Sequence, residues 1–147
     1  MTTEISFYQL TRPLDAVLPR LLEKAVAGGH RVVVRAYDPA LLKRLDTLLW
    51  TYDPASFLPH AVDGDHAAAQ PVLLTTSRGP AANGATIAAV IDGVFDEAAF
   101  GLARILYLFD SDGLDAARAY WREFRERHGV TASYWSEDDG GRWSKQA

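Results

Sequence analysis

The sequence predicts a single α/β domain built on an open, mostly parallel β-sheet with helices on both faces. Three observations predict this fold. Segments rich in β-branched and aromatic residues alternate with segments whose apolar residues recur at helical spacing. Residues 31–35 form a short, continuous apolar run that is typical of a buried parallel strand. The chain of 147 residues is long enough to bury one core, and it has no cysteine that could add disulfides.

The first half of the chain has the pattern strand, helix, strand, helix. Residues 4–10 predict a strand, and the apolar stripe of residues 14–25 predicts a helix that Gly28 and Gly29 end. Because Pro19 lies inside this stripe, we expect the helix to be kinked there or to begin later. After the buried strand, the dipeptide at residues 38–39, Asp-Pro, supplies an N-cap and a first-turn proline for the second helix.

The second half adds further strands and two helices. We expect strands at residues 72–75, 86–91, 104–109 and 131–135. A short helix is expected at residues 96–100, and a longer one from Asp112 or Gly113 to Arg127. We therefore divide the chain into an α/β domain at residues 1–135 and a polar, flexible tail at residues 136–147.

The second helix carries a tryptophan outside its apolar stripe. The leucines of residues 41–49 fall on one face, whereas Trp50 is rotated away from that face. Just beyond it, prolines at 54 and 59 flank Phe57 in a segment that can be neither helix interior nor central strand. Two readings stay open. Trp50 and Phe57 either cover a neighbouring element of the protein or form a patch for a protein partner.

The predicted last helix carries a row of arginines. They are spaced at i, i+4 and i+7 and line one side of the helix: Arg118, Arg122 and Arg125. Trp121 lies between this row and the apolar face. Guanidinium groups beside an aromatic ring suit an acidic peptide that ends in an apolar side chain and a carboxylate. The alternative is a solvated helix face on which Glu123 and Glu126 neutralise the arginines.

The residues argue against several chemistries. The connection between the first strand and helix, residues 10–13 (LTRP), has no glycine, so we expect a Rossmann-like topology without a phosphate-binding loop and with no cofactor. No GxxxxGK[ST], GxSxG or HExxH motif is present. The four histidines have no ligand spacing and suit solvated or capping positions, and Asp63, Asp65 and His66 suit a loop better than a metal site.

Charge and hydropathy limit the partners. A formal net charge of -4 argues against a protein that binds nucleic acid strongly by its overall field. The N-terminus lacks the pattern of a signal peptide, and no apolar stretch is long enough to span a bilayer. We therefore expect a soluble, cytoplasmic protein.

Three runs of residues resemble a known family. The runs LDTLLW and SFLPH, within residues 45–60, and ARAYWREFRERHGVTASYW, residues 117–135, are similar to the chi subunit of bacterial DNA polymerase III holoenzyme. The order of strands and helices agrees up to Trp135, and residues from about 61 to 103 match only loosely. The resemblance implies a non-catalytic accessory subunit that is associated with the clamp loader in DNA replication.

The resemblance also implies two partners. In this family the last helix and the strand before it bind the acidic C-terminal tail of single-stranded-DNA-binding protein. Residue-by-residue matching implies a tail site at Arg118, Trp121, Arg122, Leu108 and Arg125. The spacing from Leu108 to Arg118 departs from the family pattern, and Asp115 lies near the place where a lysine is expected.

Trp50 and Phe57 match the surface that binds the psi subunit and, in some members, an accessory helicase. A protein with both surfaces would be a bridge, and linking two weak contacts raises the effective concentration of the second. The alternative function is a nucleotide-dependent enzyme, which only the sheet architecture suggests.

The acidic residues 137–139 followed by Trp143 imitate an acidic ligand with an aromatic end. We therefore hypothesise that the tail folds back on the arginine row and competes for it.

Overall fold

An eight-stranded sheet forms the centre of the computed structural model, which describes residues 2–53, 55–56 and 58–147. The strand order is β3-β4-β2-β5-β6-β1-β7-β8, and every neighbouring pair is parallel apart from the antiparallel pair β7–β8. The strands are β1 (Thr3–Gln9), β2 (Val32–Arg35), β3 (His60–Val62), β4 (Val72–Thr75), β5 (Ile87–Val90), β6 (Arg104–Phe109), β7 (Val130–Glu137) and β8 (Trp143–Lys145). This arrangement confirms the expected open, mostly parallel sheet.

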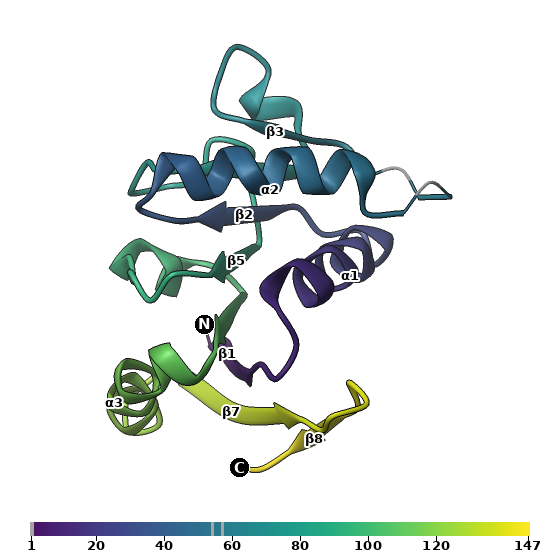
Figure 1. The fold of residues 1–147 in the computed structure, drawn as a ribbon. Coiled ribbons are helices and arrows are strands. Elements are labelled where there is room, and N and C mark those ends of the chain that lie inside the picture. Colours follow the sequence, from purple (N-terminus) through teal and green to yellow (C-terminus); the bar gives the residue numbers. More distant parts are fainter. Residues whose placement is uncertain (1, 54, 57) are drawn as a thin grey trace.

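Helices cover both faces of the sheet (Figure 1). The helices are α1 (Leu14–Ala27), α2 (Pro39–Thr51) and α3 (Leu114–Phe124), with short 3-10 turns η1 (Ala67–Ala69), η2 (Glu97–Gly101) and η3 (Ser111–Gly113). Helices α1 and α2 pack on one face, and α3 and η2 pack on the other. The Asp38 side chain accepts a hydrogen bond from the amide of Ala40, which confirms the predicted N-cap of α2.

Helix α1 contains Pro19 as a buried residue and begins before it, at Leu14. The expectation of a later start is therefore wrong. Val17, Leu18 and Leu22 are buried around the proline, and burial of this apolar face offsets the backbone hydrogen bond that proline cannot donate.

The α3 side of the sheet has an aromatic core. In the sheet register Phe7 lies between Tyr107 and Tyr134 on the two neighbouring strands. Its ring centroid is 5.1 Å from that of Tyr107 and 6.5 Å from that of Tyr134. Phe124 of α3 packs over this row and is 1% exposed, a burial that contributes roughly 1.5–3 kcal/mol. The row fixes α3 against the sheet.

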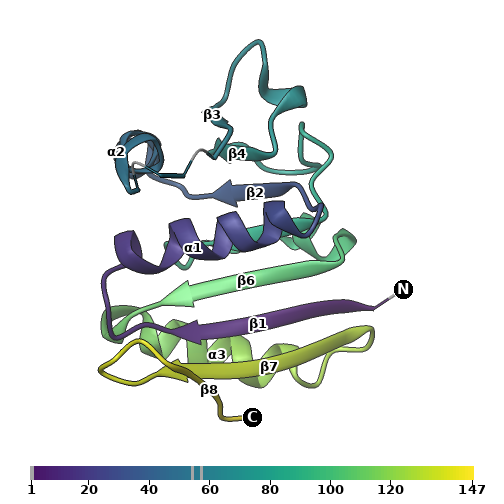
Figure 2. The ribbon, with the colours of Figure 1, turned by 90° about the vertical axis from the view of Figure 1, so that its right-hand side faces the viewer.

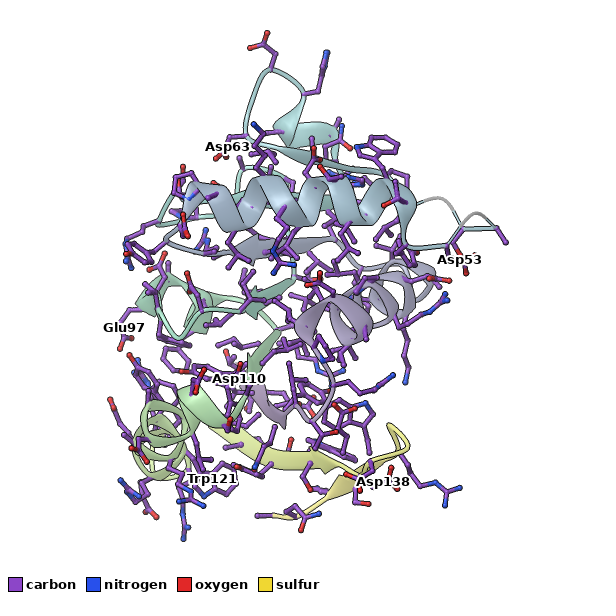
Figure 3. The ribbon with its side chains drawn as sticks, in the orientation of Figure 1. Asp53, Asp63, Glu97, Asp110, Trp121 and Asp138 are labelled. Atoms are coloured by element: carbon purple, nitrogen blue, oxygen red, sulfur yellow. The ribbon has the colours of Figure 1, made fainter. Side chains whose placement is uncertain are left out.

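The chain after Trp135 differs from the expected flexible tail. Strand β7 continues to Glu137, and after a turn at Asp138, labelled in Figure 3, β8 pairs antiparallel with β7. Trp143 packs against Tyr8 with ring centroids 5.1 Å apart, on the α1 side of the sheet. The tail therefore does not lie on the arginine row of α3, which was the hypothesis, because its aromatic residue finds a contact on the opposite face.

The sequence analysis missed one strand and misplaced one helix end. Strand β3 was missed because its three residues form a strand only through their pairing with β4. Helix α3 ends at Phe124 and not at Arg127. The amides of Glu126 and Arg127 bond to carbonyl groups three residues back, at Glu123 and Phe124, so the last turn tightens and leaves the α-helix.

Candidate partner-binding surfaces

The arginine row of α3, made of Arg118, Arg122 and Arg125, is exposed to solvent. Within the described part of the chain, Arg118 and Arg122 form no ion pair. Arg125 lies 3.5 Å from the carboxylate of Glu126, but both side chains are more than half exposed, so this pair is weak. The alternative was that glutamates neutralise all three arginines. Only Arg125 has such a partner among the described residues, so Arg118 and Arg122 remain available for an anion.

Trp121, labelled on α3 in Figure 3, connects this row to the aromatic core. Its ring makes edge-to-face contacts with Phe7 at 5.8 Å and Tyr134 at 5.6 Å. Arg125 lies over the same ring, with its guanidinium carbon 6.0 Å from the ring centroid. The half-buried Trp121 thus forms a rigid apolar border beside the arginines.

Tyr134 belongs to this surface, although the sequence analysis did not select it. Its hydroxyl donates a 2.6 Å hydrogen bond to Gln9 Oε1. Burial raises the pKa of Tyr134, and the charge of Arg118 opposes that rise. Strand alternation could have identified the residue, because Tyr134 and Ala132 point to the same face of β7.

Leu108 does not join this surface, which corrects the expected tail-binding set. It is 1% exposed and packs in the core on the α1 side, whereas Arg118 and Trp121 lie on the α3 side. Successive side chains of a strand point to opposite faces. The next residue, Phe109, therefore faces α3, with its ring 5.9 Å from that of Tyr134.

Trp50 forms the second candidate surface, near the end of α2. Its side chain is 55% exposed, whereas Leu42, Leu45 and Leu49 on the helix stripe are buried. This confirms that the tryptophan lies outside the core pattern. Its ring packs on the imidazole of His60, with centroids 4.6 Å apart, so it covers a neighbour and still exposes more than half its area. Phe57, expected in the same patch, lies outside the described residues.

His60 packs against the Trp50 ring and supports it. The sequence suggested a solvated or capping histidine, but this residue is 5% exposed. Its Nδ1 lies 2.7 Å from the carbonyl oxygen of Leu58, and its Nε2 lies 3.1 Å from Asp46 Oδ1 on α2. These contacts fix the ring under Trp50.

In the loop that follows β3, Asp63, labelled in Figure 3, is exposed.

Contacts to α1 hold the segment that follows Trp50. Arg20 Nη2 lies 3.0 Å from Asp53 Oδ2. The hydroxyl of Tyr52 donates a 2.8 Å hydrogen bond to Glu23, and that bond lowers the pKa of the Glu23 carboxyl. Ser56 donates to the same carboxylate at 3.3 Å. Tyr52, Asp53 and Ser56 are therefore anchored to α1.

A cleft of about 800 Å³ opens at the carboxyl ends of β1, β5 and β6. Parallel sheets of this kind commonly bind ligands at this edge. Here, however, the amides of Thr11 and Arg12 donate to the Glu137 carboxylate at 2.7 and 2.8 Å, so these two donors are already used by an internal anion. The cleft lining holds more carboxylates than cations, which further disfavours a phosphate: Asp15, Asp92, Asp110 and Asp112 beside Arg12 and Arg44.

Comparison with known proteins identifies one family. Residues 1–132 match the model of a family described as DNA polymerase III chi subunit, HolC. No curated protein matches the chain. The matched range includes α2 and α3 and ends within β7, so β8 lies beyond it. In the described parts of the chain, every helix is too short or too polar to cross a bilayer.

Proposed function

Since this chain belongs to the chi subunit family of DNA polymerase III, we propose that it is a non-catalytic accessory subunit of the holoenzyme, associated with the clamp loader in the cytoplasm. In this role it bridges the psi subunit and the acidic C-terminal tail of single-stranded-DNA-binding protein. The observation that carries the proposal is the presence of two separate exposed surfaces, one centred on Trp50 and one on Arg118.

The tail-binding surface is the arginine row with Trp121. Arg118 and Arg122 are cationic groups with no carboxylate partner in the described chain, so binding an acidic peptide costs no internal ion pair. Tyr134 and Trp121 supply aromatic area for an apolar terminal side chain. Arg125 lies at the rim, where its contact with Glu126 reduces its contribution.

The psi-binding surface is Trp50, held in place by His60, together with Phe57. A half-exposed tryptophan on a rigid support is a strong anchor for a protein partner, because little side-chain freedom is lost on binding. We extend the proposal to an accessory helicase as a second partner for this surface.

A nucleotide-dependent enzyme is the less favoured function. The cleft at the carboxyl edge is large enough for a nucleotide, but Glu137 accepts hydrogen bonds from the loop amides, and aspartates outnumber arginines in the lining. A thermal shift of several degrees with ATP, NAD or a flavin would favour the enzyme over the adaptor.

Titration with a labelled acidic peptide that ends in proline and phenylalanine tests the tail-binding surface. Arg118→Ala should weaken binding about tenfold, since hydrogen bonds to charged groups contribute roughly 1.5–3 kcal/mol. Affinity should also fall as salt increases. Lys43→Ala is the matched control, because it removes an exposed positive charge from α2. Equal peptide affinity of wild type and Arg118→Ala, or an affinity that does not change with salt concentration, would refute the assignment of this surface.

Pull-down from the native cell extract tests the Trp50 surface. Trp50→Ala should lose the psi subunit, and the helicase if it shares the surface, while Arg118→Ala keeps both. Tyr37→Ala is the control, because Tyr37 is an aromatic side chain that is 71% exposed elsewhere on the molecule. Retention of the partners by Trp50→Ala would show that the surface has another role.

A further inference from the structure

A groove of about 370 Å³ lies on the α1 side of the sheet, beside β1, β5 and β6. Figure 2 shows this side, where α1 crosses the sheet and leaves β1 and β7 uncovered by a helix. Polar and apolar side chains line the groove together: Glu4, Tyr8, Lys24 and Arg104 beside Leu21 and Ile87. It is separate from α3, which packs on the other face, and from the cleft at the carboxyl edge.

Arg104 in the groove wall has incomplete hydrogen bonding. The side chain is half-buried, and its Nη2 donates to the Tyr8 hydroxyl at 3.1 Å and, at the long distance of 3.4 Å, to Ser6 Oγ. Its Nε is buried and has no hydrogen-bond partner in the part of the chain that the structure describes. A guanidinium removed from bulk water needs acceptors for five N–H groups, and two hydroxyl groups supply few of them.

Arg104 also lacks a counter-ion within the described residues. Three other arginines near the sheet do contact a carboxylate: Arg12 with Glu137, Arg35 with Asp96 and Arg44 with Asp15. Glu4 is directly opposite Arg104 in the sheet register, yet the two side chains form no ion pair. With Lys24 on the groove wall, two cations face one carboxylate, so the groove favours a negatively charged occupant.

We propose that this groove binds a small organic anion. Its phosphate or carboxylate group pairs with Arg104 and Lys24, and its apolar part lies on Leu21 and Ile87. The volume falls in the range of roughly 300–1,000 Å³ that is usual for small-ligand sites. The site is independent of the proposed adaptor role, since it uses neither Trp50 nor the arginine row.

Hydrogen bonds extend from Arg104 toward β7. Ser133 Oγ donates to Ser6 Oγ at 3.3 Å, and the indole N–H of Trp135 donates to Ser133 Oγ at 3.1 Å. Ser6 Oγ also accepts a hydrogen bond from Arg104. An anion that draws the guanidinium toward the groove therefore alters the hydrogen bonds that link Ser6, Ser133 and Trp135. The indole N–H of Trp135 is therefore a second reporter of occupancy, beside the Arg104 Nε–H.

The test is a nuclear magnetic resonance titration of the full ¹⁵N-labelled chain with phenyl phosphate, benzoate and inorganic phosphate. We expect saturable shifts of the Arg104 Nε–H, the Trp135 indole N–H and the amides of Leu21 and Ala25. Phenyl phosphate should bind several-fold more tightly than inorganic phosphate, because only the former has an apolar part. The ratio of phenyl phosphate to benzoate affinity identifies which oxyanion the groove prefers.

Variants then assign the site. Arg104→Gln should weaken phenyl phosphate binding about tenfold or more, and Glu4→Gln should strengthen it several-fold, because a repelling charge is removed. Lys43→Gln, on α2, should leave the affinity unchanged. Shifts confined to the arginine row of α3, or a Glu4→Gln variant that binds no better than wild type, would overturn the proposal. The Glu4→Gln comparison decides the question even if Arg104→Gln does not fold.

Discussion

The Glu137 side chain is fully buried and holds the start of α1 against the end of β7. Its carboxylate accepts hydrogen bonds from the Thr11 amide at 2.7 Å, the Arg12 amide at 2.8 Å and Arg12 Nε at 3.0 Å. Burial by itself raises the pKa of the Glu137 carboxyl, but the hydrogen bonds from Arg12 and Thr11 outweigh that effect and lower it. The ionised form is therefore the one that stabilises the fold.

The lowered pKa of Glu137 predicts a pH dependence of stability. A group whose pKa is lower in the folded state stabilises the protein above its unfolded pKa, about 4.3 for glutamate, and the stabilisation is lost as the pH falls through the folded pKa. Glu137→Gln should lower the free energy of unfolding at pH 7 by about 1–3 kcal/mol and flatten its decline toward acid pH.

Chemical denaturation of wild type and Glu137→Gln between pH 7 and pH 3 measures this effect. Asp139→Asn is the control, because Asp139 is an exposed carboxylate two residues away. If Asp139→Asn changes the pH profile as much as Glu137→Gln does, the stabilisation does not come from the buried carboxylate.

At the scale of elements, β8 protects the sheet. It pairs with the end of β7, which would otherwise expose unpaired backbone groups along this stretch, and it carries Trp143 onto Tyr8. The turn that leads to β8 is itself bonded to the first loop, because the Thr11 hydroxyl donates to the Asp138 carbonyl at 3.2 Å. A segment outside the range matched by the family model thus contributes to the fold.

Trp143→Ala should destabilise the protein by about 1–3 kcal/mol. Truncation of a fully buried tryptophan to alanine costs roughly 3–5 kcal/mol of stability. The Trp143 side chain is only partly buried, so the expected cost is smaller. Trp50→Ala is the matched comparison and should cost less, because its ring is 55% exposed. Thermal or denaturant unfolding measures both variants, and an equal loss in the two would contradict the structural role of β8.

On the scale of the whole molecule, the two proposed binding surfaces lie on opposite faces of the sheet. Helix α2 packs with α1 over one face, whereas α3 packs on the aromatic core of the other, and Figure 1 shows α2 and α3 at opposite ends of the molecule. The sheet therefore separates the two proposed surfaces.

We therefore expect the two contacts to be independent. Trp50→Ala should leave the affinity for the acidic peptide unchanged within about twofold, and Arg118→Ala should leave psi binding unchanged, since distant sites without shared contacts behave additively. Calorimetric titration of each ligand, with and without a saturating amount of the other, measures the coupling. A change of tenfold in either affinity would mean that the surfaces are linked through the sheet.

Local patterns were sufficient where the signal lay within one element. The leucine stripe placed Trp50 outside the core, Asp38 capped α2, and the spacing of the arginines put all three on the exposed side of α3. Patterns failed where a contact joined distant residues. Leu108 was assigned to the wrong face, because the register of β6 against α3 decides which of two successive strand residues faces the helix.

The order of apolar and polar residues by itself determined the open parallel sheet, the helices on both faces and the aromatic and cationic side chains that could meet partners. Only the tertiary structure decided that Glu137 binds the amides of the first loop, that Trp143 reaches Tyr8 through β8, and that Arg104 has no counter-ion among the described residues. Helix and strand periodicity follows from neighbouring residues. Glu137 and Thr11, by contrast, meet only after the whole sheet has formed, and no local pattern specifies such a contact.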